Sequence, residues 1–155
     1  MSVARELADL VSAAPSTDAN FDNGTFVVDV SEDRVGIGTT APGSLLHLHS
    51  TGTPILQMET TGTVDREYQI QIVHGDGRFS IRDETASANR VALLTSGNFG
   101  IGVDAPASLL HVAGTVQVGV DGTGHDVIFY GNAAGALAMW DTSADSFIVR
   151  GATAD

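Results

Sequence analysis

The sequence predicts a mainly β protein in which a short N-terminal helix precedes stacked short strands and hairpins. Three observations support this fold class. Helical periodicity is confined to the first residues, alternation with a period of two begins at Phe26, and a glycine-containing unit occurs twice. The 18 glycines and the aromatic content of only 6% indicate a core of small aliphatic residues, shared in part with other chains.

The only convincing helical pattern lies between Val3 and Ala14. Its apolar stripe consists of Val3, Leu7, Leu10 and Val11, and Pro15 ends it. So short a helix is marginal alone in water and needs a partner. Two partners remain open: identical helices in a short bundle or coiled coil, or another component on which the helix is an anchor. Residues 15–24, rich in Ser, Asp and Asn, are predicted to be a linker.

Strands are predicted wherever apolar and polar residues alternate. Residues 26–30 form the first such stretch. The run YQIQIVHGDGRFSIRD (68–83) places Asp76 and Gly77 between two alternating segments, which is the strongest hairpin signal in the chain. Further strands are expected over 116–120, 126–130 and 146–150, separated by glycine-containing turns.

An internal repeat is the most informative feature. VGIGTTAPGSLLHL (35–48) matches FGIGVDAPASLLHV (99–112) at nine of fourteen positions, and the second copy begins 64 residues after the first (99 − 35 = 64). In each copy two glycines flank an isoleucine, so that another backbone can approach one side of the strand closely. Pro42 and Pro106 end that strand, and the SLLH run begins the next.

One copy of this unit is too small to bury its own apolar face. Ile37, Leu46 and Leu48 form that face in the first copy, and Ile101, Leu110 and Val112 form it in the second. Either copies stack along an axis, or three chains wind around it. These six residues, together with Trp140, are therefore the predicted packing positions.

The repeat resembles the GIGT-x-x-P-x-x-x-LHV element of tail fibres and other appendage proteins of marine, cyanophage-like tailed phages. GHDVIFYGNAAGALAMWDTSADSFIVRGA (124–152) is similar to a second element of such proteins, a DV-x-F-x-G strand followed by a W-D-x-S-x-D turn and another strand. With the N-terminal helix and linker, the resemblance covers most of the chain, apart from about residues 50–90. Longer relatives continue beyond the second element, whereas this sequence ends at Asp155.

The resemblance implies an elongated, intertwined homotrimeric β-fibre of β-prism or β-helix type. Residues 1–24 would anchor it to a tail tube, adaptor, baseplate or capsid protein, and the remainder would support host recognition through a surface glycan or protein. The expected modules are 25–64 with the first repeat, 65–98 with the hairpin, and 99–155 with the second repeat and the Trp-Asp turn. Such a protein is assembled in the host cytoplasm and carried on the virion. The alternative is a capsid-surface fibre or decoration (cement) protein.

Charge and composition exclude several functions. With 7 Lys and Arg against 19 Asp and Glu, the net charge of −12 disfavours nucleic acid and anionic membranes. The chain has no cysteine, and no apolar run is long enough to span a bilayer. The charged residues Arg5, Glu6 and Asp9 argue against a signal peptide, and therefore against a secreted bacterial adhesin.

Candidate chemical sites are few. His47 and His49 point to the same side of a strand and, in a threefold fibre, could surround a metal ion; alternatively they are ordinary polar residues, as Ala113 in the second repeat suggests. Asp141 and Asp145 could bind calcium, but Asp141 and Ser143 are expected to satisfy turn amides instead. Gly36–Thr39 lacks the lysine of a phosphate loop.

No arrangement of catalytic residues is recognisable. Asp83 and Glu84 lie in a predicted polar turn, and no nucleophile motif occurs. We therefore expect neither enzymatic activity, including glycan cleavage, nor a cofactor.

Overall fold

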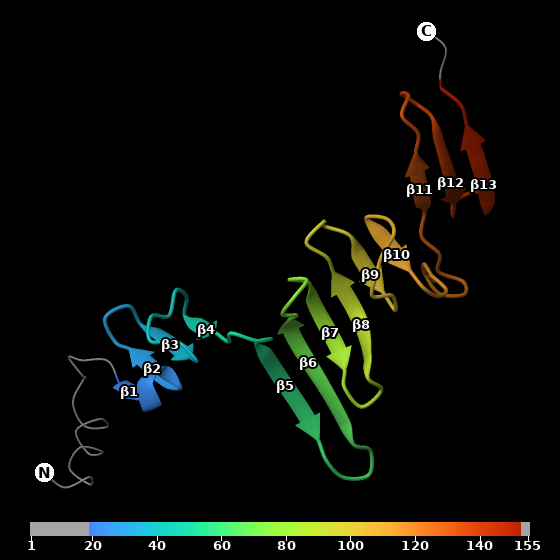
Figure 1. Cartoon of the computed structure of the whole chain (residues 1–155). Coiled ribbons are helices and arrows are strands. Elements are labelled where there is room, and N and C mark those ends of the chain that lie inside the picture. Colours follow the sequence, from blue (N-terminus) through green and yellow to red (C-terminus); the bar gives the residue numbers. More distant parts are fainter. Residues whose placement is uncertain (1–18, 153–155) are drawn as a thin grey trace, which may run out of the picture. The chain divides into compact units, whose positions relative to one another are not determined.

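The computed structural model describes residues 19–152, which are built almost wholly from β-strands (Figure 1). Within these residues the helical structure is one 3-10 turn, η1 (Asp22–Gly24). The prediction of a mainly β fold is thus confirmed. The expected helix, with Val3, Leu7, Leu10 and Val11, lies outside the described residues. The chain divides into two compact units, Met1–Ala113 and Gly114–Asp155, and each is described by itself.

The first unit contains two sheets. The smaller sheet has the order β1-β2-β3-β4 and consists of β1 (Ala19–Phe21), β2 (Phe26–Asp29), β3 (Arg34–Ile37) and β4 (Leu46–Leu48). Its strands are antiparallel except for β3 and β4, which run parallel. The two strands of the first sequence repeat are therefore direct neighbours.

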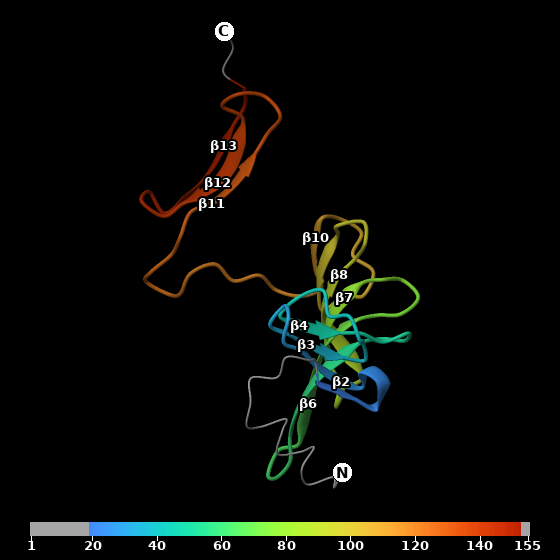
Figure 2. The same ribbon diagram turned by 90° about the vertical axis from the view of Figure 1, so that its left-hand side faces the viewer.

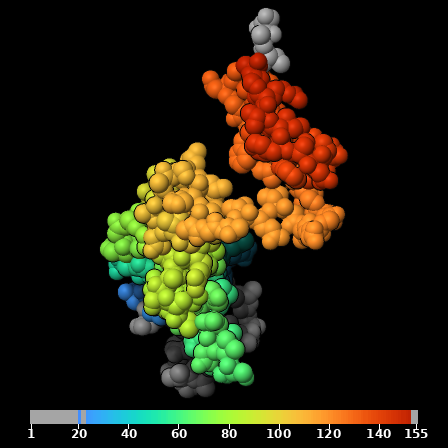
Figure 3. Space-filling model, turned by 90° about the vertical axis from the view of Figure 1, so that its right-hand side faces the viewer, coloured from blue at the N-terminus to red at the C-terminus, as the bar shows by residue number. Residues whose placement is uncertain are grey.

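The larger sheet has six strands in the order β10-β9-β8-β7-β6-β5. They are β5 (Ile55–Thr60), β6 (Arg66–Ile72), β7 (Phe79–Asp83), β8 (Ala88–Leu93), β9 (Phe99–Ile101) and β10 (Leu110–Val112). Only the β9–β10 pair is parallel. The β5–β6 end, green in Figure 3, projects beyond the neighbouring strands. This one sheet takes strands from all three modules expected after residue 24.

The predicted hairpin at 68–83 is confirmed. Strands β6 and β7 pair with Ile72 opposite Phe79. The connection is longer than the two-residue turn that Asp-Gly often forms, because the Val73 N–H donates to Arg78 O at 2.9 Å and closes a loop of residues 74–77. Gly77, with φ of +68°, supplies the left-handed conformation that this loop needs.

The second unit contains a three-stranded antiparallel meander, which Figure 2 shows as a single layer. Its strands are β11 (Val127–Tyr130), β12 (Leu137–Asp141) and β13 (Ser146–Arg150). Two of the three lie where the sequence predicts strands. The strand expected over 116–120 is wrong, since only Val120 forms an isolated bridge, to Thr123. Gly119 and Gly122, with φ of +79° and +78°, bend this segment into a tight turn.

The sequence repeat is part of a larger three-stranded repeat. β2-β3-β4 and β8-β9-β10 have the same strand directions. Gly36 lies between Val27 and His47 in the first copy, and Gly100 lies between Ala92 and His111 in the second. The outer strands β2 and β8 were not recognised as equivalent because their sequences differ.

Glycine is required at the centre of each repeat because the connecting loop crosses the strand there. Residues 38–45 are a short connection for two parallel strands, so the chain turns back directly over β3. A Cβ on Gly36 would lie 2.7 Å from Thr39 O, and one on Gly100 would lie 2.4 Å from Val103 O. The prediction of close backbone approach is thus confirmed, and the approaching backbone belongs to the same unit.

The loop of each repeat has the same serine hydrogen bond but a different one to its proline carbonyl. The Ser44 hydroxyl donates to Leu46 O at 3.0 Å, and the Ser108 hydroxyl donates to Leu110 O at 2.7 Å. The carbonyl of the buried proline is held by a different side chain in each copy. Arg34 Nη1 donates to Pro42 O at 3.1 Å, and Asn98 Nδ2 donates to Pro106 O at 2.9 Å.

Three hairpins share one loop design that the sequence analysis did not recognise. An aspartate ends the first strand, and its carboxylate accepts backbone N–H groups of the loop; these residues are Asp29, Asp83 and Asp141. Four residues later a non-glycine residue has positive φ; these are Asp33, Ser87 and Asp145. The carboxylate thereby replaces the hydrogen bonds that a turn leaves unmade.

Candidate interaction surfaces

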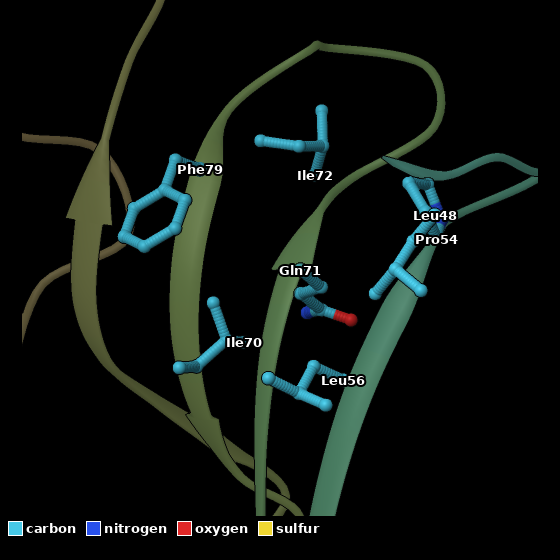
Figure 4. Close-up of a pocket in the computed structure, with 7 residues that line it drawn as sticks. All are labelled: Leu48, Pro54, Leu56, Ile70, Gln71, Ile72 and Phe79. Atoms are coloured by element: carbon cyan, nitrogen blue, oxygen red, sulfur yellow. The ribbon is translucent and has the colours of Figure 1, made fainter. Parts of the chain in front are cut away.

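One face of the six-stranded sheet is apolar in every strand. Cross-strand partners lie on the same face, and that face alternates every second residue. The register gives one continuous set: Leu56, Met58, Tyr68, Ile70, Ile72, Phe79, Ile81, Val91, Leu93, Phe99, Ile101, Leu110 and Val112. We call this set the apolar face. A shallow hollow of about 230 Å³ on it is lined by residues that include Leu56, Ile70 and Phe79 (Figure 4).

The described part of the chain has almost no apolar core of its own. Among the side chains that the structure describes, the fully buried apolar ones are Val27 and Ala92, and both lie on the side of the strand that the repeat loop crosses. By contrast, Ile101 on the apolar face is 43% exposed and Leu110 is 62% exposed. A soluble domain normally buries such side chains, and an exposed apolar surface of this kind marks an interface.

Equivalent residues of the two repeats are exposed to nearly the same extent. Ile37 is 44% exposed and Ile101 43%, while Leu46 is 57% exposed and Leu110 62%. Leu48 and Val112 are half-buried. The packing residues predicted from the sequence are therefore not covered within one chain. The most exposed pair, Leu45 at 77% and Leu109 at 76%, was not singled out, although both stand in the duplicated SLLH run.

The meander of the second unit is apolar on both faces. Trp140 stands between Val127 and Phe147 in one row across the sheet, and Met139 stands between Ile128 and Ile148 on the other face. Trp140 is 42% exposed. The predicted role of Trp140 in packing against another module or chain is thus still open in this single chain.

The two candidate metal-binding histidines lie close together, but the backbone engages one nitrogen of each. The ring centres of His47 and His49 are 6.1 Å apart. Nδ1 of His47 accepts the Gly43 N–H at 3.2 Å, and Nδ1 of His49 lies 3.0 Å from Gly38 O. Among residues 19–152, no group of three or more His, Cys, Asp or Glu side chains is placed to hold a metal ion.

The aspartate expected to satisfy turn amides does so. Asp141 Oδ1 accepts the Ser143 N–H at 2.9 Å and the Ala144 N–H at 3.3 Å. Asp145 has φ of +46° and ends the loop. The Trp-Asp turn is thus one of the three aspartate-capped hairpin loops.

Several loop carboxylates have lowered pKa values. The Arg90 guanidinium, at 2.6 Å, and the Ala86 N–H lower the pKa of Asp83 below its ordinary value of 3.8. The Ser31 hydroxyl, followed by the backbone N–H groups of Glu32 and Ser31, lowers the pKa of Asp29. The Thr142 N–H and hydroxyl lower the pKa of Asp126. Each carboxylate is thus favoured in its charged form by donors that are fixed by the fold.

The opposite face of the six-stranded sheet is polar. Gln69, Gln71 and Ser80 are buried on it, and Gln71 Nε2 donates to Ser80 Oγ at 3.0 Å. Arg82 pairs with Glu84 at its edge. Together these side chains make a face that differs in chemistry from the apolar face behind it.

No model of a known protein family matches the sequence, and no curated protein matches it either. Within residues 19–152, no helix combines the length and the apolar character that crossing a bilayer requires.

Proposed function

We propose that this chain is one subunit of a homotrimeric virion appendage, a tail fibre or its virion-attached portion, that supports recognition of and adsorption to the host cell. The observation that carries the proposal is the apolar face, which extends over six strands and is largely uncovered within one chain. The resemblance of the duplicated GIG unit to appendage proteins of tailed phages supports the same function.

Other copies of the same chain can pack against the apolar face and bury it. Fully burying one Leu, Ile or Phe side chain stabilises a structure by about 1.5–3 kcal/mol, so thirteen apolar positions offer ample driving force. Identical chains present identical surfaces, and rotation about an axis closes the assembly. The net charge of −12 opposes indefinite association and keeps the assembly soluble.

The mechanism of such an appendage is mechanical. Intertwined strands hold three distal ends in fixed geometry, so that individually weak contacts with the host gain avidity through effective concentration. The N-terminal residues, with Val3, Leu7, Leu10 and Val11, dock on a tail tube, adaptor, baseplate or capsid protein. No catalytic step is involved.

Sedimentation equilibrium tests the assembly. A trimer has three times the chain mass of 16.0 kDa, and a monomer at micromolar concentration would reject the proposal. Imaging of virions that carry a label at the C-terminus tests the location. Label on the tail supports a tail fibre, whereas label distributed over the head supports the alternative, a capsid-surface fibre or decoration protein.

A further inference from the structure

A chemically labile pair of residues stands at the start of the smaller sheet. Asn23 precedes Gly24, and it is the only asparagine of the chain that is followed by glycine. In such a pair the glycine nitrogen, which no side chain hinders, can attack the amide carbon of the asparagine side chain. Ammonia leaves and a succinimide ring forms, which water then opens to aspartate or isoaspartate. Asparagine is one of the thermolabile residues, and Asn23 is the position where this chain is most open to the reaction.

The structure restrains the nitrogen that would attack. The Gly24 N–H donates a hydrogen bond of 2.8 Å to Asn20 Oδ1. The attack requires the nitrogen to give up its proton, and the hydrogen bond both retains that proton and fixes the direction of the N–H. Gly24 is buried, whereas Asn23 is exposed. The side chain that would react is therefore open to water, but the group that would attack it is shielded.

The backbone conformation of Asn23 adds a second restraint. Its φ of 49° and ψ of 44° lie in the left-handed region. Closure of the succinimide ring requires the Gly24 nitrogen and the Asn23 Cβ to eclipse each other about the Cα–C bond. At this ψ the two atoms lie on nearly opposite sides of that bond. The rotation that brings them together also moves the Gly24 N–H away from Asn20, so the ring can form only after η1 unwinds.

We propose that Asn23 is a site of spontaneous deamidation whose rate is set by the hydrogen bond between Gly24 and Asn20. Asn20 lies in β1, and its backbone is held opposite Val27 of β2. The sheet thereby fixes the position of the side-chain acceptor. Asn20 is a positioning residue, because it takes no part in the bonds that form and break. The closed turn suppresses the reaction, and each opening of the turn permits it.

Deamidation at Asn23 disturbs the first repeat directly. A Cβ on Gly24 would lie 2.9 Å from Thr40 Cγ2, so the crossing loop packs tightly on this glycine. On the next residue, Thr25 O accepts the Gly38 N–H at 3.3 Å. Isoaspartate routes the main chain through Cβ and lengthens it by one carbon atom, which shifts Gly24 and Thr25 against that loop. The modification therefore loosens the loop of the first repeat and leaves the second repeat unchanged.

The experiment follows deamidation of the full chain at neutral pH. Peptide mapping by mass spectrometry measures the fraction of Asn23 that has become acid, and chromatography separates aspartate from isoaspartate. Asn20→Ala removes the acceptor. We expect this variant to deamidate at Asn23 about fivefold faster than the parent, the factor that corresponds to one hydrogen bond. Asn20→Asp is the matched control, because it keeps an acceptor oxygen for the Gly24 N–H and should react no faster than the parent.

The unfolded chain supplies the reference rate. In concentrated urea the parent and both variants should deamidate at one common rate, which is higher than that of the folded parent. Circular dichroism establishes that Asn20→Ala is folded in buffer. Equal rates for the parent in urea and in buffer, or equal rates for folded Asn20→Ala and the parent, would overturn the proposal.

A second measurement needs no variant. The Gly24 N–H of the folded parent should be protected from hydrogen exchange, because exchange also requires the turn to open. Rapid exchange of this N–H would overturn the proposal even where Asn20→Ala fails to fold. Both measurements are local to η1, so their outcome stands apart from the proposed function.

Discussion

The backbone N–H of Gly43 donates a hydrogen bond of 3.2 Å to Nδ1 of His47. The same bond recurs in the second repeat, where the Ala107 N–H donates to Nδ1 of His111 at 3.3 Å. These histidines fasten the crossing loop to the strand that follows it. The presence of a histidine at this position in both repeats is thus explained by its hydrogen bond to the loop backbone.

Replacing either histidine should therefore lower stability by a similar amount. We expect His47→Ala and His111→Ala each to reduce the free energy of unfolding by about 1 kcal/mol, with the double variant close to the sum. Urea denaturation measures both. His74→Ala, in the exposed β6–β7 turn, is the control and should change little. A strong effect of one histidine alone would contradict a shared role.

The central glycines should tolerate no side chain. Gly36→Ala and Gly100→Ala place a Cβ 2.7 Å and 2.4 Å from a loop carbonyl oxygen, so we expect each to cost about 1–3 kcal/mol. Gly43→Ala is the matched control within the same loop, because a Cβ there meets nothing within 4 Å. Thermal melting distinguishes them; equal melting temperatures for Gly36→Ala and Gly43→Ala would show that the loop moves away freely.

The aspartate-capped hairpins predict an unusual gain from glycine. Ser87 has φ of +50°, a left-handed conformation that costs a residue with a side chain about 1–2 kcal/mol. Ser87→Gly relieves this cost but increases the conformational entropy of the unfolded chain. We therefore expect a net stabilisation of about 0.5 kcal/mol. Ser87→Val is the opposite control and should destabilise. Destabilisation by glycine would mean that the Ser87 side chain makes a needed contact.

Acid should weaken the loop that Asp83 caps. Because its pKa is lower in the folded chain than the ordinary 3.8, its stabilising contribution is complete above that value and is lost as the pH falls through the folded pKa. We expect the stability difference between the parent and Asp83→Asn to be large at pH 7 and to shrink below pH of about 3.8. Asp121→Asn, in the exposed 121–124 turn, serves as control. A difference that persists unchanged in strong acid would refute the role of the Arg90 contact.

A charge on the apolar face should dissociate the assembly. Ile101→Glu places a carboxylate among the side chains that the proposed trimer buries, and an unpaired buried charge is strongly unfavourable. We expect this variant to sediment as a monomer or to aggregate. Gln57→Glu adds the same charge to the opposite face of β5 and should leave the trimer intact. Normal assembly of Ile101→Glu would place the subunit contact elsewhere.

The sequence predicts a good part of this fold because its main signals are local. Alternation and the Asp76-Gly77 dipeptide mark the β6–β7 hairpin, and the Gly-Ile-Gly unit marks the close backbone approach at Gly36. The parallel pairing within each repeat depends on the path by which the loop crosses the strand. No residue pattern in the sequence predicts that path. Val27 and Ala92 occupy equivalent places without sequence identity, so the third strand of the repeat was missed.

The candidate sites were less predictable. Leu45 and Leu109 are exposed because each lies directly before a short edge strand, a detail set by the loop. Arg78 lies in the loop before β7 and Asn89 lies in β8, so their unpartnered buried atoms become visible only when the sheet is assembled. The strand expected over 116–120 was wrong because valines at alternate positions indicate a strand on their own. Gly119, between two of these valines, has φ of +79° and turns the backbone instead.

The hydroxyls of Ser44 and Ser108 have a further consequence. The carbonyls that they bind, those of Leu46 and Leu110, belong to border strands β4 and β10. The neighbouring residues, Leu45 and His49, use their own backbone groups toward β3, so the Leu46 carbonyl points outward. The serine hydroxyl uses one of the two lone pairs of this carbonyl and so competes with the N–H of an incoming strand, which weakens strand addition at this edge. The apolar face can thus stay open to partners while the β4 and β10 edges are less available for pairing with another strand.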